Sequence, residues 1–171
     1  MTEHITINKI LDEDERYRLL ISQIKSLLTK EDNLISNLSN LTAVIKDTFE
    51  KVSWVGFYLF DRQKLYLGPF QGKVACTNIE IGKGVCGSAA ARRETIIVPD
   101  VEEFPGHIAC DSNSKSEIVV PLIQNDHLLG VLDLDSYAYN SFSNTDKEYL
   151  EEICKFLSDE IFTSNFQNKK K

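Results

Sequence analysis

The chain has 171 residues and a hydrophobic fraction of 42%, enough to bury one core of ordinary size, and we expect a single domain over residues 1–171. Its net charge of −7 gives no general attraction to nucleic acid or anionic lipid, so neither is an expected partner. The sequence starts without a cationic segment followed by an apolar run, and no stretch reaches about 18 apolar residues, so a cytoplasmic protein is expected.

Two amphipathic helices are predicted in the first third of the chain. Apolar residues recur every three and four positions over 12–30, with charged residues between them. A second helix is predicted to start after Asp32 as its N-cap. Its apolar stripe consists of Leu34, Ile35, Leu38, Leu41, Ile45 and Phe49. Both stripes are typical of core packing and not of a cofactor site.

The middle of the chain has the alternation typical of strands. Residues 53–60, a turn at 61–64 and a return at 65–67 predict a hairpin, and further strands are expected at 73–77, 95–98, 117–123 and 128–135. A short helix is predicted over 85–92 and a last one over about 144–163, capped by Ser143 or Asn144. This order predicts an α+β fold, in which the N- and C-terminal helices pack on one face of an antiparallel sheet of about six strands.

The four cysteines fall into two groups. Cys154 lies on the apolar stripe of the last helix and is expected to be a core residue, whereas Cys76, Cys86 and Cys110 lie in the loop-rich part of the chain. Cys110 stands in a polar segment, HIACDSNSKSE, where a thiol needs a chemical reason. With no export signal, the expected compartment is reducing, so any disulfide formed here would be catalytic or redox-sensing.

A zinc site is the alternative use of these cysteines. His107 could complete a Cys3His set, but only His107 and Cys110 are close in sequence, and structural zinc ligands usually come in close pairs. Thiol redox chemistry, in which one thiolate attacks and a second resolves the oxidised product, fits the spacing better. We therefore expect neither a metal nor another cofactor.

Three acidic residues lie in otherwise apolar strands. Glu117 lies at the start of one predicted strand. Asp133 and Asp135 alternate with leucines in GVLDLDS, so both aspartates lie on one face of their own strand. A carboxylate in such a strand costs free energy unless it is paired or lies in a cleft. Trp54 and Tyr58 likewise share one face of their strand and would suit a pocket wall. The alternatives are a strand end in solvent for the aspartates and ordinary packing for the aromatic pair.

Six motifs in this order carry a resemblance to a known family. They are WVGFYL (54–59), GPFQGKVACT (68–77), IGKGVCG (81–87), FPGHIACDS (104–112), SEIVVPL (116–122) and GVLDLDS (130–136). Together they closely resemble the free methionine-(R)-sulfoxide reductases, which are GAF-fold enzymes that reduce the R epimer of the free amino acid's sulfoxide. The resemblance covers nearly the whole chain and includes all three loop cysteines, a set that ordinary GAF sensor domains lack.

The resemblance implies a role for each loop cysteine. Cys110 would be the nucleophile and Cys76 the resolving thiol, while Cys86 would help to bind the substrate or act as a second resolving thiol. It further implies that an external dithiol protein, thioredoxin, reduces the oxidised pair, and that no cofactor takes part. Because family members are often dimeric, it also points to a homodimer.

The resemblance also implies roles for the polar and aromatic residues. Glu117, Asp133 and Asp135 would contact the sulfoxide and the amino group, with Glu117 or Asp135 as the proton donor. Trp54 and Tyr58 would surround the methyl-sulfur end of the substrate. The segment 137–143, YAYNSFS, departs from the family because it lacks the prolines that are common there.

Two other functions remain open at this stage. One is a GAF sensor module that binds a small ligand, such as a cyclic nucleotide, and performs no chemistry. The other is a thiol redox switch or a zinc protein. A metal assay, and thiol titration before and after an oxidant, would separate the last two from an enzyme.

Overall fold

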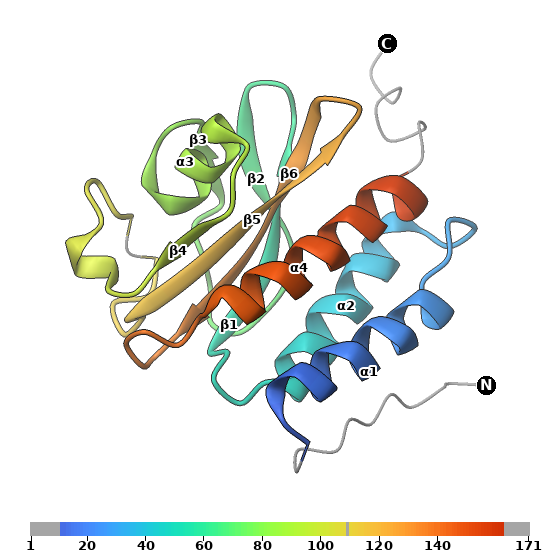
Figure 1. Ribbon diagram of the computed structural model, residues 1–171. Coiled ribbons are helices and arrows are strands. Elements are labelled where there is room, and N and C mark those ends of the chain that lie inside the picture. The colour runs from blue at the N-terminus through green and yellow to red at the C-terminus, as the bar shows by residue number, and fades with distance from the viewer. Residues whose placement is uncertain (1–10, 109, 163–171) are drawn as a thin grey trace.

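One antiparallel sheet runs through the molecule. The computed structural model describes residues 11–108 and 110–162. Its six strands have the spatial order β3-β2-β1-β6-β5-β4 (Figure 1). They are β1 (Trp54–Phe60), β2 (Lys64–Gln71), β3 (Asn78–Glu80), β4 (Ile96–Val98), β5 (Ser116–Gln124) and β6 (His127–Ser136). The predicted α+β class, with a single sheet of about six strands, is confirmed.

The helices divide between the two faces of the sheet. One face is covered by α1 (Glu13–Leu27), α2 (Leu34–Thr48) and α4 (Asn144–Phe156), and a π-helical turn, Leu157–Ile161, continues α4 (Figure 1). The other face carries α3 (Gly84–Arg92) and a 3-10 turn, Val101–Glu103. The terminal helices therefore share one face, as predicted, and the opposite face is left to α3 and loops. Within the described ranges, no helix has the length and apolar content that a membrane span needs.

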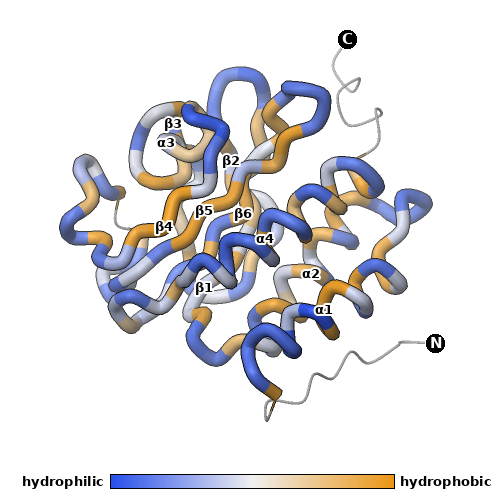
Figure 2. Tube along the Cα trace, viewed as in Figure 1, coloured by the Kyte–Doolittle hydropathy of each residue, from blue (hydrophilic) through white to orange (hydrophobic). Residues whose placement is uncertain are grey.

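The alternation of β1 separates two apolar clusters. Val55, Phe57 and Leu59 face the three-helix layer and belong to the larger core, which contains the predicted stripes of α1, α2 and α4. Trp54 and Tyr58 face the other way, toward α3. The hydropathy of the chain follows this division, with apolar strands at the centre and polar residues on the outer helix surfaces (Figure 2). The side that holds the smaller cluster is the one with room for a site.

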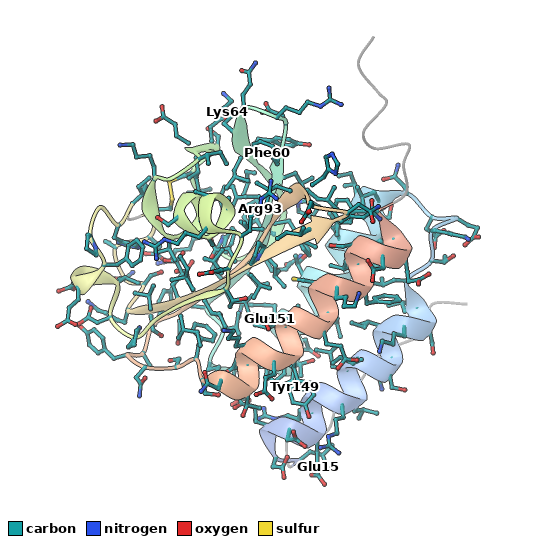
Figure 3. All side chains as sticks on the ribbon, turned by 45° about the horizontal axis from the view of Figure 1, so that its top comes forward. Glu15, Phe60, Lys64, Arg93, Tyr149 and Glu151 are labelled. Carbon is teal, nitrogen blue, oxygen red and sulfur yellow. A yellow bond between two sulfur atoms is a disulfide. The ribbon has the colours of Figure 1, made fainter. Side chains whose placement is uncertain are left out.

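The start of α4 is tied to the rest of the helical layer by a buried carboxylate. Asp146 is fully buried and accepts hydrogen bonds from the Tyr17 hydroxyl at 2.7 Å and from the backbone N–H of Ser143 at 2.8 Å. The Lys51 ammonium lies 2.7 Å from the same carboxylate. One turn further along α4, Tyr149 lies on the side of the helix that faces α1 (Figure 3). It stacks on Tyr17, with ring centroids 5.0 Å apart. Both oxygens of Asp146 are satisfied, and it forms a capping box with Ser143, the N-cap of α4, which stabilises the start of the helix.

Two predictions for the second helix were wrong, one on its cap and one on its apolar stripe. Asn33, not Asp32, caps α2, because its side chain accepts from the backbone N–H of Ile35 at 2.9 Å. Ile35 itself is 49% exposed and not part of the core. The last helix keeps α geometry only to Phe156, and its expected end at residue 163 lies outside the described residues.

The predicted strand at 73–77 was also wrong. This segment forms a loop, and the third strand is the short β3 that follows it. Two of its carbonyls accept hydrogen bonds from side chains: the Trp54 indole N–H donates to the Lys73 carbonyl at 3.0 Å, and the Tyr58 hydroxyl donates to that of Cys76 at 3.1 Å. Alternating sequence does not reveal such bonds to residues about twenty positions away.

Candidate active site

Strand register brings the three acidic residues together. Glu117 of β5 and Asp135 of β6 are direct cross-strand partners, and Asp133 lies two residues from Asp135 on the same face. On the other side of β6, Asp135 is paired with Trp54 and Asp133 with Gly56. The acids therefore lie in the centre of the sheet, on the face away from the three-helix layer.

A pocket opens on this face between the sheet, the start of α3 and the loops that follow β2 and β4. It has an empty volume of about 540 Å³ with its mouth included. Seven of the eight predicted site residues line it: Trp54, Tyr58, Cys86, Cys110, Glu117, Asp133 and Asp135. The eighth, Cys76, is bonded to Cys110 at the mouth. Residues that lie up to 81 positions apart in sequence thus form one cavity.

The aromatic wall of the pocket depends on a missing side chain. The Trp54 ring stacks between Tyr58 and Phe70, with centroids 6.1 Å and 5.6 Å away. It lies across Gly56, where a Cβ atom would come within 2.3 Å of the indole ring. Only glycine leaves room for this packing. The indole also holds the loop that carries Cys76 through its bond to Lys73.

Two of the loop cysteines form a disulfide. Cys76 and Cys110 are linked, with their Cα atoms 5.6 Å apart, although 34 residues separate them in sequence. Cys110 is exposed at the pocket mouth and Cys76 is half-buried. The disulfide shows that the fold brings this pair within bonding distance, as a nucleophile and its resolving thiol require. Cys154 is a free thiol in the larger core, as expected.

Cys86 has a different environment. It is a free thiol, 3% exposed, at the start of α3, and its Sγ donates to Asp133 Oδ2 at 3.2 Å. Burial, and then the charges of Asp133 and Glu117, raise the pKa of Cys86 well above its usual value. Cys86 therefore stays protonated near neutral pH and is a poor nucleophile.

The acidic residues are desolvated to different degrees. Glu117 is 5% exposed, and burial followed by the charge of Asp135 raises its pKa well above the usual value. Burial, and then the charges of Glu117 and Asp135, raise the pKa of Asp133 in the same way. Asp135 is less enclosed, and burial raises its pKa to about 6, with a hydrogen bond from Ser114 acting in the opposite direction. The environment thus favours the protonated forms of Glu117 and Asp133, whereas Asp135 is mostly ionised near pH 7.

One oxygen in the cluster has no partner. Asp133 is 6% exposed, and its Oδ1 makes no hydrogen bond within residues 11–108 and 110–162. Buried polar atoms are nearly always bonded in folded proteins, and exceptions mark places where a ligand or water belongs. The pocket therefore offers a buried acceptor for a cationic or hydrogen-bonding group.

A zinc site made of the three loop cysteines and His107 was the alternative hypothesis. The Cys3His set does not assemble, because Cys76 and Cys110 are bonded to each other. A different group, Cys86, Glu117 and Asp133, has ligand atoms within 4.8 Å of one another. These are the groups whose pKa values burial raises, so a cation would have to displace their protons.

Two further residues lie beside the acids, and of these only His107 was singled out from the sequence, as a possible zinc ligand. Burial lowers the pKa of His107, and its Nε2 atom lies 3.5 Å from Glu117 Oε2, so a neutral imidazole faces this acid. Ser114 is 6% exposed and bonds to Asp135. The polar run DSNS was a signal that this loop would not be packed in the core.

Comparison with known proteins identifies the fold. The sequence model of the GAF domain matches residues 33–161. The "GAF domain-containing protein A" of Dictyostelium discoideum is 52% identical over 158 residues, which cover 92% of this chain and 99% of that protein. The free methionine-R-sulfoxide reductase of Saccharomyces cerevisiae is 44% identical over 164 residues, 91% of each chain. The chain belongs to the free methionine-R-sulfoxide reductase family of GAF-domain proteins.

A solved structure of this family superposes on nearly the whole chain. It is the free methionine-R-sulfoxide reductase of Neisseria meningitidis in complex with its substrate, with a TM-score of 0.84 and 45% identity over 91% of this chain and 92% of that one. The family resemblance expected from the six motifs is therefore confirmed, and so is the GAF fold.

Proposed function

We propose that this protein reduces free methionine-(R)-sulfoxide to methionine, with Cys110 as the nucleophile. The observation that carries the proposal is the Cys76–Cys110 pair, which forms a disulfide at the mouth of a pocket whose floor holds desolvated carboxyls. A sulfoxide sulfur is a weak electrophile until its oxygen accepts a proton, so its reduction needs a thiolate and an acid side by side. The pocket has desolvated carboxyls, and Cys110 can supply the thiolate once its disulfide with Cys76 is reduced.

The first step is attack by Cys110 on the sulfoxide sulfur. Glu117 donates a proton to the sulfoxide oxygen as Cys110 Sγ bonds to the substrate sulfur. The S–O bond and this S–S bond then break as the hydroxyl passes to Cys110, and methionine leaves. One thiol and one sulfoxide become one sulfenic acid and one thioether, so the atoms balance. Glu117 suits the acid role because burial and the neighbouring charge of Asp135 raise its pKa and so favour the protonated carboxyl.

The amino end of the substrate has a separate place. The ammonium group donates to Asp133 Oδ1, which has no other partner in the described structure. The arriving positive charge lowers the pKa of Asp133 and lets it ionise, so the pair forms only when a free amino acid binds. Trp54 and Tyr58 pack against the methyl-sulfur end, and Cys86 holds Asp133 in place through its S–H bond. A methionine within a peptide lacks the ammonium and is therefore excluded.

The second step closes the disulfide. The Cys76 thiol attacks the Cys110 sulfenic acid, water leaves, and the pair reaches the oxidised form that the structure contains. Cys86 is not the resolving thiol in this scheme, because its raised pKa keeps it protonated and its sulfur is bonded to Asp133. An external protein dithiol, thioredoxin, then reduces the disulfide.

The cellular setting follows from this chemistry. Turnover needs a compartment that keeps thiols reduced, so the protein acts in the cytoplasm, with residues 1–171 as one catalytic domain that uses neither metal nor cofactor. A homodimer remains part of the proposal by resemblance to the family. The rival function, a GAF sensor without chemistry, does not account for a cysteine pair that closes over the pocket.

The deciding experiment compares the two epimers. Wild-type protein with dithiothreitol should consume free methionine-(R)-sulfoxide and leave the S epimer and N-acetylated methionine sulfoxide untouched. Cys110→Ser should be inactive, whereas the matched control Cys154→Ser, which changes a core thiol, should keep activity. Absence of activity in the wild type, or activity that survives in Cys110→Ser, would overturn the proposal.

A further inference from the structure

Apolar side chains are exposed around the disulfide. Val74 is 88% exposed, Tyr137 48% and Ile108 41%. They are three of the six large apolar side chains that are exposed in the described part of the chain. Val74 and Ile108 each lie two residues before a cysteine of the disulfide, and Tyr137 bonds to the residue after Cys110. We call Val74, Ile108 and Tyr137 the apolar rim.

The polar atoms of this region are already satisfied. Asp111 Oδ2 accepts from the Tyr137 hydroxyl at 2.8 Å and lies 3.3 Å from the Lys73 ammonium. The same ammonium lies 5.3 Å from the centre of the Tyr137 ring. Lys73 and Asp111 thus neutralise each other, and a partner that covers them leaves no unpaired charge. These contacts also tie together the two loops that carry the cysteines.

The two sulfurs of the disulfide differ in access. Cys110 is exposed, whereas Cys76 is half-buried and its carbonyl is bonded to the Tyr58 hydroxyl. Thiol–disulfide exchange requires a thiolate to reach one sulfur along the axis of the S–S bond. Access therefore favours attack at Cys110, with Cys76 as the leaving group.

We propose that the apolar rim is the docking surface for a protein dithiol, which attacks Cys110. The inference rests on the proposed function, because turnover requires that the disulfide be reduced. The partner is a small protein with an exposed Cys-x-x-Cys pair surrounded by an uncharged, apolar surface. Such a surface matches a rim beside which Lys73 and Asp111 pair with each other, and exposed apolar patches of this kind mark interaction sites.

The exchange balances in two steps. The partner's first thiolate bonds to Cys110 Sγ, the Cys76–Cys110 bond breaks, and Cys76 leaves as a thiolate that takes up a proton. The partner's second thiol then attacks its own first sulfur and releases Cys110 as a thiol. The partner is oxidised to its disulfide, and this chain recovers both thiols.

The surface is tested by comparing a protein dithiol with a small one. The rate of disulfide reduction is measured without methionine sulfoxide, using thioredoxin or dithiothreitol, so the result does not depend on whether the proposed activity is correct. Val74→Ser and Tyr137→Ser should each lower the second-order rate with thioredoxin by about fivefold to tenfold. The rate with dithiothreitol should stay unchanged. Ile35→Ser, on α2 at a position as exposed as Tyr137, is the matched control and should change neither rate.

The variants separate docking from loop positioning. Tyr137→Phe keeps the apolar ring and loses the hydrogen bond to Asp111, so it should retain the thioredoxin rate. A loss in Tyr137→Phe equal to that in Tyr137→Ser, equal losses with both reductants, or no loss with thioredoxin would each overturn the docking proposal.

The attacked sulfur is identified by trapping. A thioredoxin whose second active-site cysteine is serine should form a mixed disulfide with the oxidised protein after an acid quench and alkylation. Peptide mass spectrometry should locate the bond at Cys110. A bond located at Cys76 would contradict the assignment.

Discussion

Asp146 and Asp133 are both buried carboxylates, but they have opposite surroundings. Asp146, beneath the helical layer, receives bonds from Tyr17, Ser143 and Lys51, and both its oxygens are satisfied. Asp133, on the other face of the sheet, receives one bond from the Cys86 thiol and leaves Oδ1 without a partner in the described structure. Asp146 thus belongs to a complete hydrogen-bond network, whereas Asp133 has an oxygen that a bound ligand could use.

This difference shows how the fold separates stability from function. Each face of the sheet buries apolar residues, but the face beneath three helices encloses the larger core. The face with one short helix keeps a cavity in which desolvated acids and a thiol lie close together. Such groups destabilise the folded state unless they are neutral, so the site is maintained by the stability of the rest of the molecule.

The largest stability effect is expected at Asp146. Asp146→Ala leaves the Tyr17 hydroxyl and the start of α4 without their buried acceptor, and should lower the free energy of unfolding by about 3 kcal/mol. Below its lowered melting temperature, the variant should keep its KM for methionine-(R)-sulfoxide. Urea denaturation measures the free energy of unfolding, and steady-state kinetics measure KM. An unchanged free energy of unfolding would contradict the structural role of Asp146.

Asp133 should give the reverse result. Asp133→Asn removes a buried acid without a loss of volume, so its stability should stay within about 1 kcal/mol of the wild type or rise. Its KM should increase about a hundredfold, because the substrate ammonium loses its charged partner. If Asp133→Asn unfolds as readily as Asp146→Ala, the contrast between the two carboxylates is wrong.

Glu117 tests the acid step within the site. Glu117→Gln cannot supply a proton to the sulfoxide oxygen and should lower kcat about a hundredfold with little change in KM. The rate of disulfide reduction by dithiothreitol should be normal in the same variant. A larger change in KM than in kcat would place Glu117 in binding and not in proton transfer.

Asp135 makes stability depend on pH. Its pKa is about 6 in the folded protein against an ordinary 3.8, so between these values the unfolded chain has released a proton that the folded protein still holds. Stability from this group is complete below about pH 4 and is lost as pH rises through 6, by about 3 kcal/mol. Asp135→Asn should flatten this part of the curve of unfolding free energy against pH, and an unaltered slope would contradict the shift.

The smallest effect is expected at Cys86. Cys86→Ala removes the S–H bond to Asp133 but no reacting group, so kcat/KM should fall about fivefold to tenfold. The oxidised variant should still contain the disulfide between Cys76 and Cys110, as thiol counting and peptide mapping would show. A variant that no longer completes the cycle would instead make Cys86 a resolving thiol.

Local pattern predicted most of the fold. The apolar spacing of α1, α2 and α4 and the alternation of β1, β5 and β6 were sufficient to find these elements, because each buries one face. The loop at 73–77 was missed because its conformation depends on bonds from Trp54 and Tyr58. The cap of α2 was misplaced by one residue because Asp32 and Asn33 are both good N-caps.

The sequence predicted which kinds of side chain form the site better than it predicted how they are arranged. Carboxylates in apolar strands and a cysteine in a polar loop were visible in the sequence. The pairing of Glu117 with Asp135 and the contact of His107 with Glu117 depend on how distant strands and loops meet. The apolar rim has no sequence signal, since Val74 and Tyr137 are recognisable as exposed only in the folded protein.

The central claim is tested most directly by a single turnover without reductant. Fully reduced protein is mixed with an excess of free methionine-(R)-sulfoxide, and methionine and protein mass are followed together. The account predicts one methionine per chain and the loss of two hydrogens as Cys76 and Cys110 join. Cys76→Ser should also release one methionine but gain one oxygen, as a sulfenic acid at Cys110. Methionine formed without oxidation of Cys110, or no methionine at all, would contradict the account.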